Sequence, residues 1–142
     1  MFLGEFVHTI DEAGRLTIPA KFREELAEGL VITRGLDRCL AIYPMDEWEQ
    51  LAERVSGLPI TDRYARAFRR LVFANASHAA PDRQGRMVIP PRLREYIGLD
   101  SEVVVIGLNT YIELWHPEPW DEERDRVEAE DGGIDQWAVL GI

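Results

Sequence analysis

The sequence predicts an α+β fold, a β-barrel built from two internal repeats of one chain with short helices between them. The first observation is a stretch that occurs twice, at residues 11–24 and 82–95, without a gap. The second is that two further β-rich runs follow each copy. A unit of this size is too small to bury both faces of its own sheet, so interleaving the two copies into one barrel would solve the problem.

The two copies agree in residue type as well as in spacing. Positions that differ change like for like, in the pairs Leu16 and Met87, Lys21 and Arg92, and Phe22 and Leu93. The identical positions are Asp11, Gly14, Arg15, Ile18, Pro19, Arg23 and Glu24 in the first copy, and Asp82, Gly85, Arg86, Ile89, Pro90, Arg94 and Glu95 in the second. Chance does not give such agreement in so short a window, so the chain contains an internal duplication.

Each copy predicts a strand, a tight turn, a second strand and a short helix. Asp11 and Asp82 suit the first position of a type I turn, and Gly14 and Gly85 suit its fourth, where a positive φ is cheap. The turn is expected to join its flanking strands as a hairpin, and a proline then stops the second strand and suits a helix start. The predicted strands are residues 6–10, 15–18, 74–79 and 86–89; helices begin at Pro19 and Pro91, with Gly29 and Gly98 placed to end them.

The rest of each half repeats a second plan, a hairpin followed by a helix start. Residues 30–33 and 39–43 form this hairpin in the first half, and Pro44 opens a helix that is broken at residues 57–59. The equivalent segments of the second half are residues 103–106, 111–115 and 117–120.

A helix at residues 61–73 is predicted to link the halves, with Asp62 or the threonine before it as N-cap. Tyr64, Phe68 and Leu71 recur at helical spacing and are expected to share one apolar face. The other faces carry arginines, which form either a solvated surface or a contact for an acidic partner or a DNA backbone. These are Arg63, Arg66, Arg69 and Arg70.

Composition is typical of a soluble globular protein, with 46% hydrophobic and 30% charged residues among 142. The sequence shows neither an apolar run of about 18 residues nor a signal peptide, so we expect a cytoplasmic protein without a membrane span. The net charge of −10 is unevenly spread: residues 61–94 hold eight arginines and two aspartates, whereas residues 118–135 hold nine acids and two arginines. Because DNA binding needs local positive potential, the negative total is weak evidence against it.

Catalytic chemistry finds little support in the sequence. His8, His78 and His116 are far apart and lack metal-ligand spacing, and Cys39 has no nearby cysteine or histidine. P-loop, dinucleotide-binding and G-x-S-x-G motifs do not occur. We therefore expect no catalytic residue, no metal ligand and no cofactor.

Arg15 and Arg86, which follow the two turns, are the candidates for contacts to DNA bases. One alternative is a turn-side ion pair with Asp11 or Asp82, worth roughly a few tenths of a kcal/mol. The other alternative is a shared basic face that binds DNA, since both copies keep the arginine and a guanidinium suits both phosphate and the O6/N7 edge of guanine. The sequence favours the two alternatives equally. The candidate phosphate contacts are Lys21, Arg23, Arg92 and Arg94, of which Arg23 and Arg94 could instead pair with Glu24 and Glu95. Asp11, Gly14, Asp82 and Gly85 are expected to set the turns and orient the arginines.

The pattern D-x-x-G-R-x-x-I-P-x-x-[FL]-R-E, present twice, resembles the MraZ family of bacterial transcriptional regulators. The opening M-F-L-G-E-F-V-H-T-I-D and the run G-L-D-R-C-L-A-I-Y-P-M-D-E-W at residues 35–48 are similar to that family as well. The resemblance extends to about Trp120. It implies a relation to the AbrB and MazE proteins, and hence a double-ψ or swapped-hairpin β-barrel in which one chain supplies both halves.

The resemblance also implies a function and an organisation. It implies a homo-oligomeric ring that binds short direct repeats in double-stranded DNA, upstream of the division and cell-wall gene cluster that includes its own gene, in association with the nucleoid. The expected division is a first AbrB-like repeat at 1–60, a linking helix at 61–75, a second AbrB-like repeat at 76–120 and an acidic C-terminal tail at 121–142.

A second hypothesis is a protein-interaction module without specific DNA binding, either antitoxin-like, with the acidic tail as the binding segment, or a ring scaffold. Salt dependence separates the two hypotheses, because DNA binding releases counterions and weakens steeply as salt rises. An interaction held by apolar contacts does not.

Overall fold

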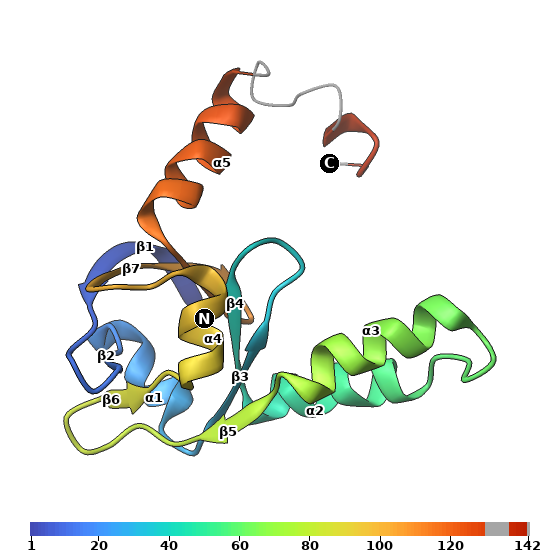
Figure 1. The fold of residues 1–142 in the computed structure, drawn as a ribbon, viewed down its shortest axis with the longest axis horizontal. Coiled ribbons are helices and arrows are strands. Elements are labelled where there is room, and N and C mark those ends of the chain that lie inside the picture. The colour runs from blue at the N-terminus through green and yellow to red at the C-terminus, as the bar shows by residue number, and fades with distance from the viewer. Residues whose placement is uncertain (130–136, 142) are drawn as a thin grey trace.

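The computed structural model describes residues 1–129 and 137–141, and its fold is mixed α+β with antiparallel strands (Figure 1). The strands are β1 Phe2–Thr9, β2 Arg15–Thr17, β3 Leu30–Arg34, β4 Leu40–Pro44, β5 Ser77–Ala79, β6 Arg86–Val88, β7 Glu102–Asn109 and β8 Ile112–Trp115. The helices are the short 3-10 helix η1 Ala20–Phe22, then α1 Arg23–Leu26, α2 Met45–Ser56, α3 Arg63–Ala74, α4 Pro91–Ile97 and α5 Pro117–Ala129.

The strands form a six-stranded sheet in the order β1-β7-β8-β4-β3-β5 and a separate two-stranded ribbon of β2 and β6. From here on, the first copy means the half of the chain that contains β1 to β4, and the second copy means the half that contains β5 to β8. If each strand is replaced by its equivalent in the other copy, the strand order is the same read in reverse. Only the β3–β4 and β7–β8 ladders lie within one copy, whereas β1–β7, β4–β8, β3–β5 and β2–β6 join the copies. The two repeats are therefore interleaved rather than placed side by side.

This pairing corrects the predicted hairpin around each turn. β1 is paired along its whole length with β7, from Phe2 opposite Asn109 to Thr9 opposite Glu102. Across the first turn only the single bridge between Ile10 and Leu16 remains of the hairpin, and β2 pairs with β6 of the other copy. The β-rich runs predicted where strands form, but such a run carries no information about its partner strand.

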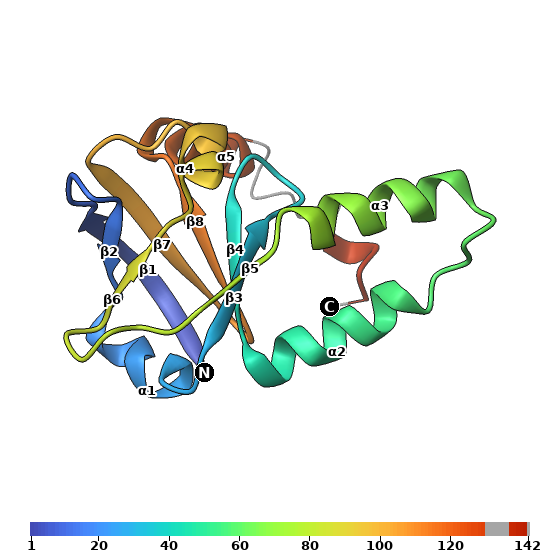
Figure 2. The ribbon, with the colours of Figure 1, turned by 60° about the horizontal axis from the view of Figure 1, so that its bottom comes forward.

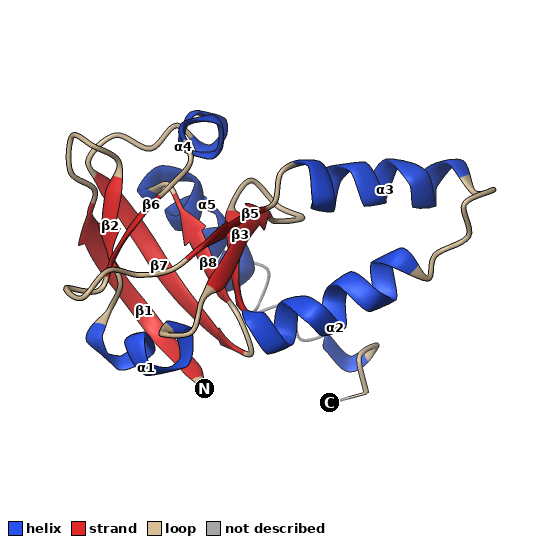
Figure 3. Ribbon diagram, turned by 90° about the horizontal axis from the view of Figure 1, so that it is seen from below, coloured by secondary structure: helices blue, strands red, loops and turns tan. Residues whose placement is uncertain are grey.

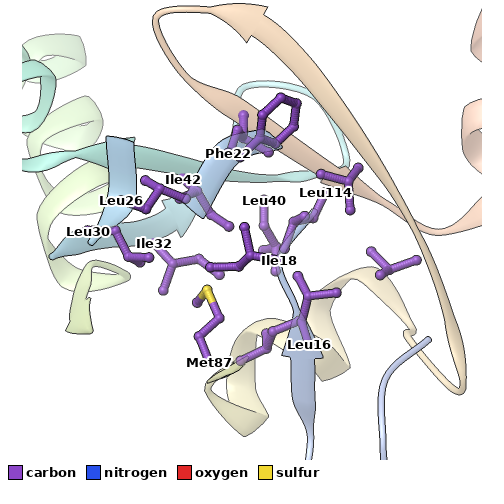
Figure 4. Close-up of a cluster of buried hydrophobic side chains, with 14 of the residues drawn as sticks. Leu16, Ile18, Phe22, Leu26, Leu30, Ile32, Leu40, Ile42, Met87 and Leu114 are labelled. Carbon is purple, nitrogen blue, oxygen red and sulfur yellow. The ribbon is translucent and has the colours of Figure 1, made fainter. Parts of the chain in front are cut away.

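The core lies where the two copies meet. Strand and helix residues of both copies, including Ile18, Phe22, Leu40 and Leu114, are almost fully excluded from solvent and pack together (Figure 4). Leu16 of β2 and Met87 of β6 face each other across the ribbon and close this core from one side. Because the core draws on both halves, neither repeat has a complete core by itself.

Helices α2 and α3 form an antiparallel pair that extends away from the sheet (Figures 2 and 3). The Asp62 carboxylate accepts the Tyr64 and Ala65 N–H groups, which confirms the N-cap. The predicted inward face is wrong for Tyr64, which is 84% exposed, because Ala65 and Val72 take the buried positions. Arg69 Nη2 donates to the carbonyls of Ser56, the last residue of α2, and of Leu58 in the connection to α3, which gives this arginine a structural role.

The remaining helices follow the prediction with shifted ends. The C-cap of α4 is Gly98, in the left-handed conformation, as expected, whereas the C-cap of α1 is Ala27, two residues before Gly29. α3 continues to Ala74, so β5 is shorter than the strand predicted there. α5 runs across the boundary drawn at residue 120; part of the predicted tail, residues 130–136 and 142, lies outside the described residues. Among the helices of the described part, none is long and apolar enough to cross a membrane.

Candidate nucleic-acid interface

The two Asp-x-x-Gly-Arg turns have the same hydrogen bonds. Asp11 Oδ1 accepts the N–H groups of Ala13 at 3.0 Å and Arg15 at 2.9 Å, and the Gly14 N–H donates to the Asp11 carbonyl at 2.9 Å. Asp82 accepts the N–H groups of Gln84 and Arg86, both at 2.9 Å, in the same way. The turn glycines Gly14 and Gly85 have φ of 80° and 76°, the positive region that favours glycine.

Each turn aspartate also holds the arginine that follows it. Arg15 Nε donates to Asp11 Oδ2 at 2.7 Å, and Arg86 Nε donates to Asp82 Oδ2 at 2.9 Å. Hydrogen bonds from the backbone N–H and from the guanidinium of the arginine lower the pKa of both carboxyl groups. The arginine side chains stay 40% and 34% exposed. Because Nε makes the ion pair, the terminal amino groups of each guanidinium remain as further hydrogen-bond donors.

The ribbon brings the two arginines onto one face. Leu16 and Met87, opposite each other, are buried, so the residues on either side of them in β2 and β6 face outward. Arg15 lies opposite Val88 and Arg86 lies opposite Thr17, which makes the two arginines diagonal neighbours, roughly 7–8 Å apart between Cα atoms. Thr17 and Val88 share this face, and sequence reasoning missed them because it placed the arginines on separate hairpins.

Lys21 and Arg92 lie in the first turns of the helices that follow the ribbon strands. Both are exposed, and Lys21 Nζ lies 5.9 Å from the centroid of the Phe6 ring. The helices that carry them, η1–α1 and α4, lie beyond opposite ends of the ribbon (Figures 2 and 3). Each of the two helices that follow the ribbon strands therefore carries one exposed basic residue in its first turn.

Arg23 and Arg94 are partly buried and turn toward the backbone instead. Arg23 Nε donates to the Ile18 carbonyl at 3.0 Å, and Arg94 Nε donates to the Ile89 carbonyl at 3.1 Å. Within the described part of the chain, neither forms the alternative ion pair with the glutamate that follows it. Their guanidinium groups cover the turn glycines of the opposite copy, a contact that the sequence could not reveal.

Other reactive groups do not gather at this face. In the described residues no three His, Cys, Asp or Glu side chains are grouped so that they could hold a metal ion. Cys39 is fully buried between the strands of the first hairpin, and burial raises the pKa of its thiol. The outward face of the ribbon carries the partly exposed guanidinium groups of Arg15 and Arg86.

Comparison with known proteins identifies similar chains over nearly the whole length. A family model described as "MraZ protein, putative antitoxin-like" matches twice, at residues 1–71 and 72–132. A protein of Thermomicrobium roseum named "Transcriptional regulator MraZ" is 54% identical over 136 residues, covering 96% of each chain. Proteins with the same name from Herpetosiphon aurantiacus and Carboxydothermus hydrogenoformans are 54% identical (88% of this chain and 87% of the relative) and 50% identical (91% and 90%).

Proposed function

The chain belongs to the MraZ family, and we propose that it is a transcriptional regulator that binds specific DNA sequences through the outward face of the β2–β6 ribbon. The observation that carries the proposal is the placement of Arg15 and Arg86 as diagonal neighbours on one exposed face, each oriented by its own aspartate. The major groove of B-DNA admits a two-stranded β-ribbon, and a guanidinium donates two hydrogen bonds to the guanine edge.

In this proposal some residues contact the DNA bases and others contact the DNA phosphates. Arg15 and Arg86 contact base edges with their terminal amino groups, while Asp11 and Asp82 fix the direction in which each guanidinium projects. Lys21 and Arg92, exposed beyond the ends of the ribbon, contact phosphates. Thr17 and Val88 complete the surface. The Thr17 hydroxyl suits a hydrogen bond to a base edge, and the apolar Val88 suits contact with a thymine methyl group.

Charge is compatible with this proposal despite the total of −10. The Asp11 and Asp82 carboxylates are each neutralised by the arginine they hold, so they do not oppose a DNA phosphate as free charges. Acidic residues are concentrated instead in and beyond α5, a different part of the chain. The charge near the ribbon, rather than the total of the whole protein, therefore decides whether DNA can bind there.

We extend the proposal to the organisation expected from the family. The four ladders between copies support a swapped-hairpin barrel in which the ribbon closes one side, with repeats at 1–60 and 76–120, a link at 61–75 and a tail from 121. A homo-oligomeric ring would let several ribbons engage several short direct repeats at once, so that avidity adds to a small single interface. The expected targets are the promoter of the division and cell-wall gene cluster, in the cytoplasm at the nucleoid.

Fluorescence anisotropy tests the function directly. The full chain is titrated onto labelled duplex from upstream of its own gene and onto a shuffled duplex, across a salt series. We expect preference for the natural duplex, a steep decrease of affinity with salt, and its loss in the double variant Arg15→Ala/Arg86→Ala. Arg54→Ala, which removes an exposed arginine of α2, is the matched control and should bind as the parent does. Equal affinity for both duplexes would refute the proposal and leave the protein-interaction hypothesis.

A further inference from the structure

We propose that Arg23 and Arg94 are positioning residues that hold the DNA-reading turn of the opposite copy, rather than phosphate contacts. Arg94 holds the turn that presents Arg15, and Arg23 holds the turn that presents Arg86. The inference rests on the proposed function for its effect on DNA, but the clamp itself is a property of the free protein.

The contact between each arginine and the opposite glycine is close. A Cβ added to Gly14 would lie 2.7 Å from Arg94 Nη1, and a Cβ added to Gly85 would lie 2.7 Å from Arg23 Cζ. Real Cβ atoms do not come so near to other heavy atoms, so the guanidinium occupies the space that a side chain would need. Gly14 and Gly85 thus need to lack a side chain for two reasons, the close contact with the arginine and the positive φ.

The backbone of the same residues completes the connection. The Ile18 N–H donates to the Gly85 carbonyl at 2.8 Å, and the Ile18 carbonyl accepts from Arg23 Nε. In the other direction, the Ile89 N–H donates to the Gly14 carbonyl at 2.9 Å, and the Ile89 carbonyl accepts from Arg94 Nε. Each isoleucine therefore ties the arginine of its own copy and the glycine of the other copy into one unit.

The position of this unit explains why it acts on the DNA-contacting arginine. Gly14 directly precedes Arg15, and Gly85 directly precedes Arg86, so a shift of the glycine moves the next Cα and its guanidinium. Arg23 and Arg94 are partly buried, whereas Lys21 and Arg92 are exposed. A partly buried side chain whose Nε is bonded to a backbone carbonyl and whose guanidinium lies against the opposite glycine is poorly placed to gain a phosphate, but well placed to fix a loop.

The planar guanidinium distinguishes this role from that of a charge. Its Nε can donate to a carbonyl while the planar group lies against the glycine of the other copy, and a lysine ammonium, which has no planar group, cannot do both. A phosphate contact tolerates lysine, because the positive charge is kept. A clamp does not.

Hydrogen–deuterium exchange of the full chain tests the clamp without DNA. In Arg94→Lys we expect faster exchange in peptides covering residues 11–17 of the first turn, and in Arg23→Lys faster exchange in peptides covering residues 82–88. Arg54→Lys is the control and should change neither. Exchange that increases only around the substituted residue, or equally in both turns, would overturn the crossed clamp whether or not the protein binds DNA.

DNA binding tests the consequence in a double-variant cycle. We expect Arg94→Lys to weaken specific binding about tenfold with an unchanged salt slope, because no phosphate contact is lost. Combined with Arg15→Ala, it should add nothing further, whereas combined with Arg86→Ala its effect should be additive. Binding by Arg94→Lys equal to that of the parent, together with a salt slope reduced by about one in Arg94→Ala, would show a phosphate contact and overturn the inference.

Discussion

The two turns share their hydrogen bonds, but the strands that lead into them differ. β1 enters the first turn as an eight-residue strand paired throughout with β7, while β5 enters the second as a three-residue strand paired with β3. The second approach is shorter because α3 continues to Ala74 and uses residues that the first copy gives to a strand. Since both turns are nevertheless alike, their geometry is set by the aspartate, glycine and arginine within them and by the clamp from the other copy.

The helices that follow the ribbon strands differ in the side chain that each of them buries in the core. Phe22 of the first copy packs edge-to-face against Phe2 and Phe6, with ring centroids 5.2 Å and 5.4 Å away. The second copy has Leu93 at the equivalent position, also buried. The first copy therefore adds an aromatic cluster to a core that both copies share.

The largest effect should come from breaking this aromatic cluster. We expect Phe22→Ala to lower the free energy of unfolding by about 4 kcal/mol and Leu93→Ala by about 3 kcal/mol, because Phe22 loses two aromatic contacts as well as buried area. Urea denaturation measures both. A greater loss in Leu93→Ala would show that the second copy carries more of the core.

Adding a side chain at the turn glycines should have the next largest effect. We expect Gly14→Val and Gly85→Val each to cost about 3 kcal/mol, since a positive φ is strained and the new side chain meets Arg94 or Arg23. Gly98→Val is the matched control, because Gly98 also has positive φ but no heavy atom of the described residues lies within 4 Å of its Cβ position. It should cost about 1 kcal/mol. Equal losses at all three positions would remove the contribution of the clamp contact.

Backbone exchange should separate the two approach strands by a smaller amount. We expect amides of β5 to open with a free energy about 1 kcal/mol or more below that of β1 amides, because three residue pairs hold β5 and eight hold β1. Hydrogen–deuterium exchange under native conditions measures the difference. Equal protection would indicate that the turns and the core, not the ladders, limit the opening of both strands.

The smallest effect concerns the turn carboxylates and should be the same in both copies. The lowered pKa of Asp11 and Asp82 means that their contribution to stability is present above their ordinary value of 3.8 and is lost as pH falls through the lowered values. Carboxyl-carbon NMR titration should therefore find both midpoints below 3.8. A midpoint at or above 3.8 for only one of them would show that the two turns are not equivalent.

The elements that the sequence predicted well are those fixed by neighbouring residues. Asp11 and Gly14 specify a turn, Pro91 a helix start and Asp62 an N-cap, because each acts on backbone groups a few residues away. α2 and α4 lie between the proline and the helix-ending residues that predicted them. The α+β class and the two repeats follow from these local elements and from the duplication.

The elements that the sequence predicted poorly depend on contacts between residues that are far apart in the sequence. The hairpin between residues 6–10 and 15–18 was wrong because strand alternation fixes a face and not a partner. The contact of Arg94 with Gly14 spans the two copies, and no local rule connects them. The pairing of Arg15 with its aspartate was foreseeable because it is local, but its position beside Arg86 was not.

The crossed pairing of strands has a consequence for how the chain is made. Phe2 in β1 pairs with Asn109 in β7, so during synthesis Phe2 has no partner until β7 of the second copy has been made. Contacts of such long sequence separation slow folding, because a large loop must close before they stabilise anything. During translation the first copy can complete only its β3–β4 hairpin and the helices beside it. The unpaired edges of β1 and β4 are then exposed to neighbouring nascent chains, which makes this the stage at which aggregation competes with folding.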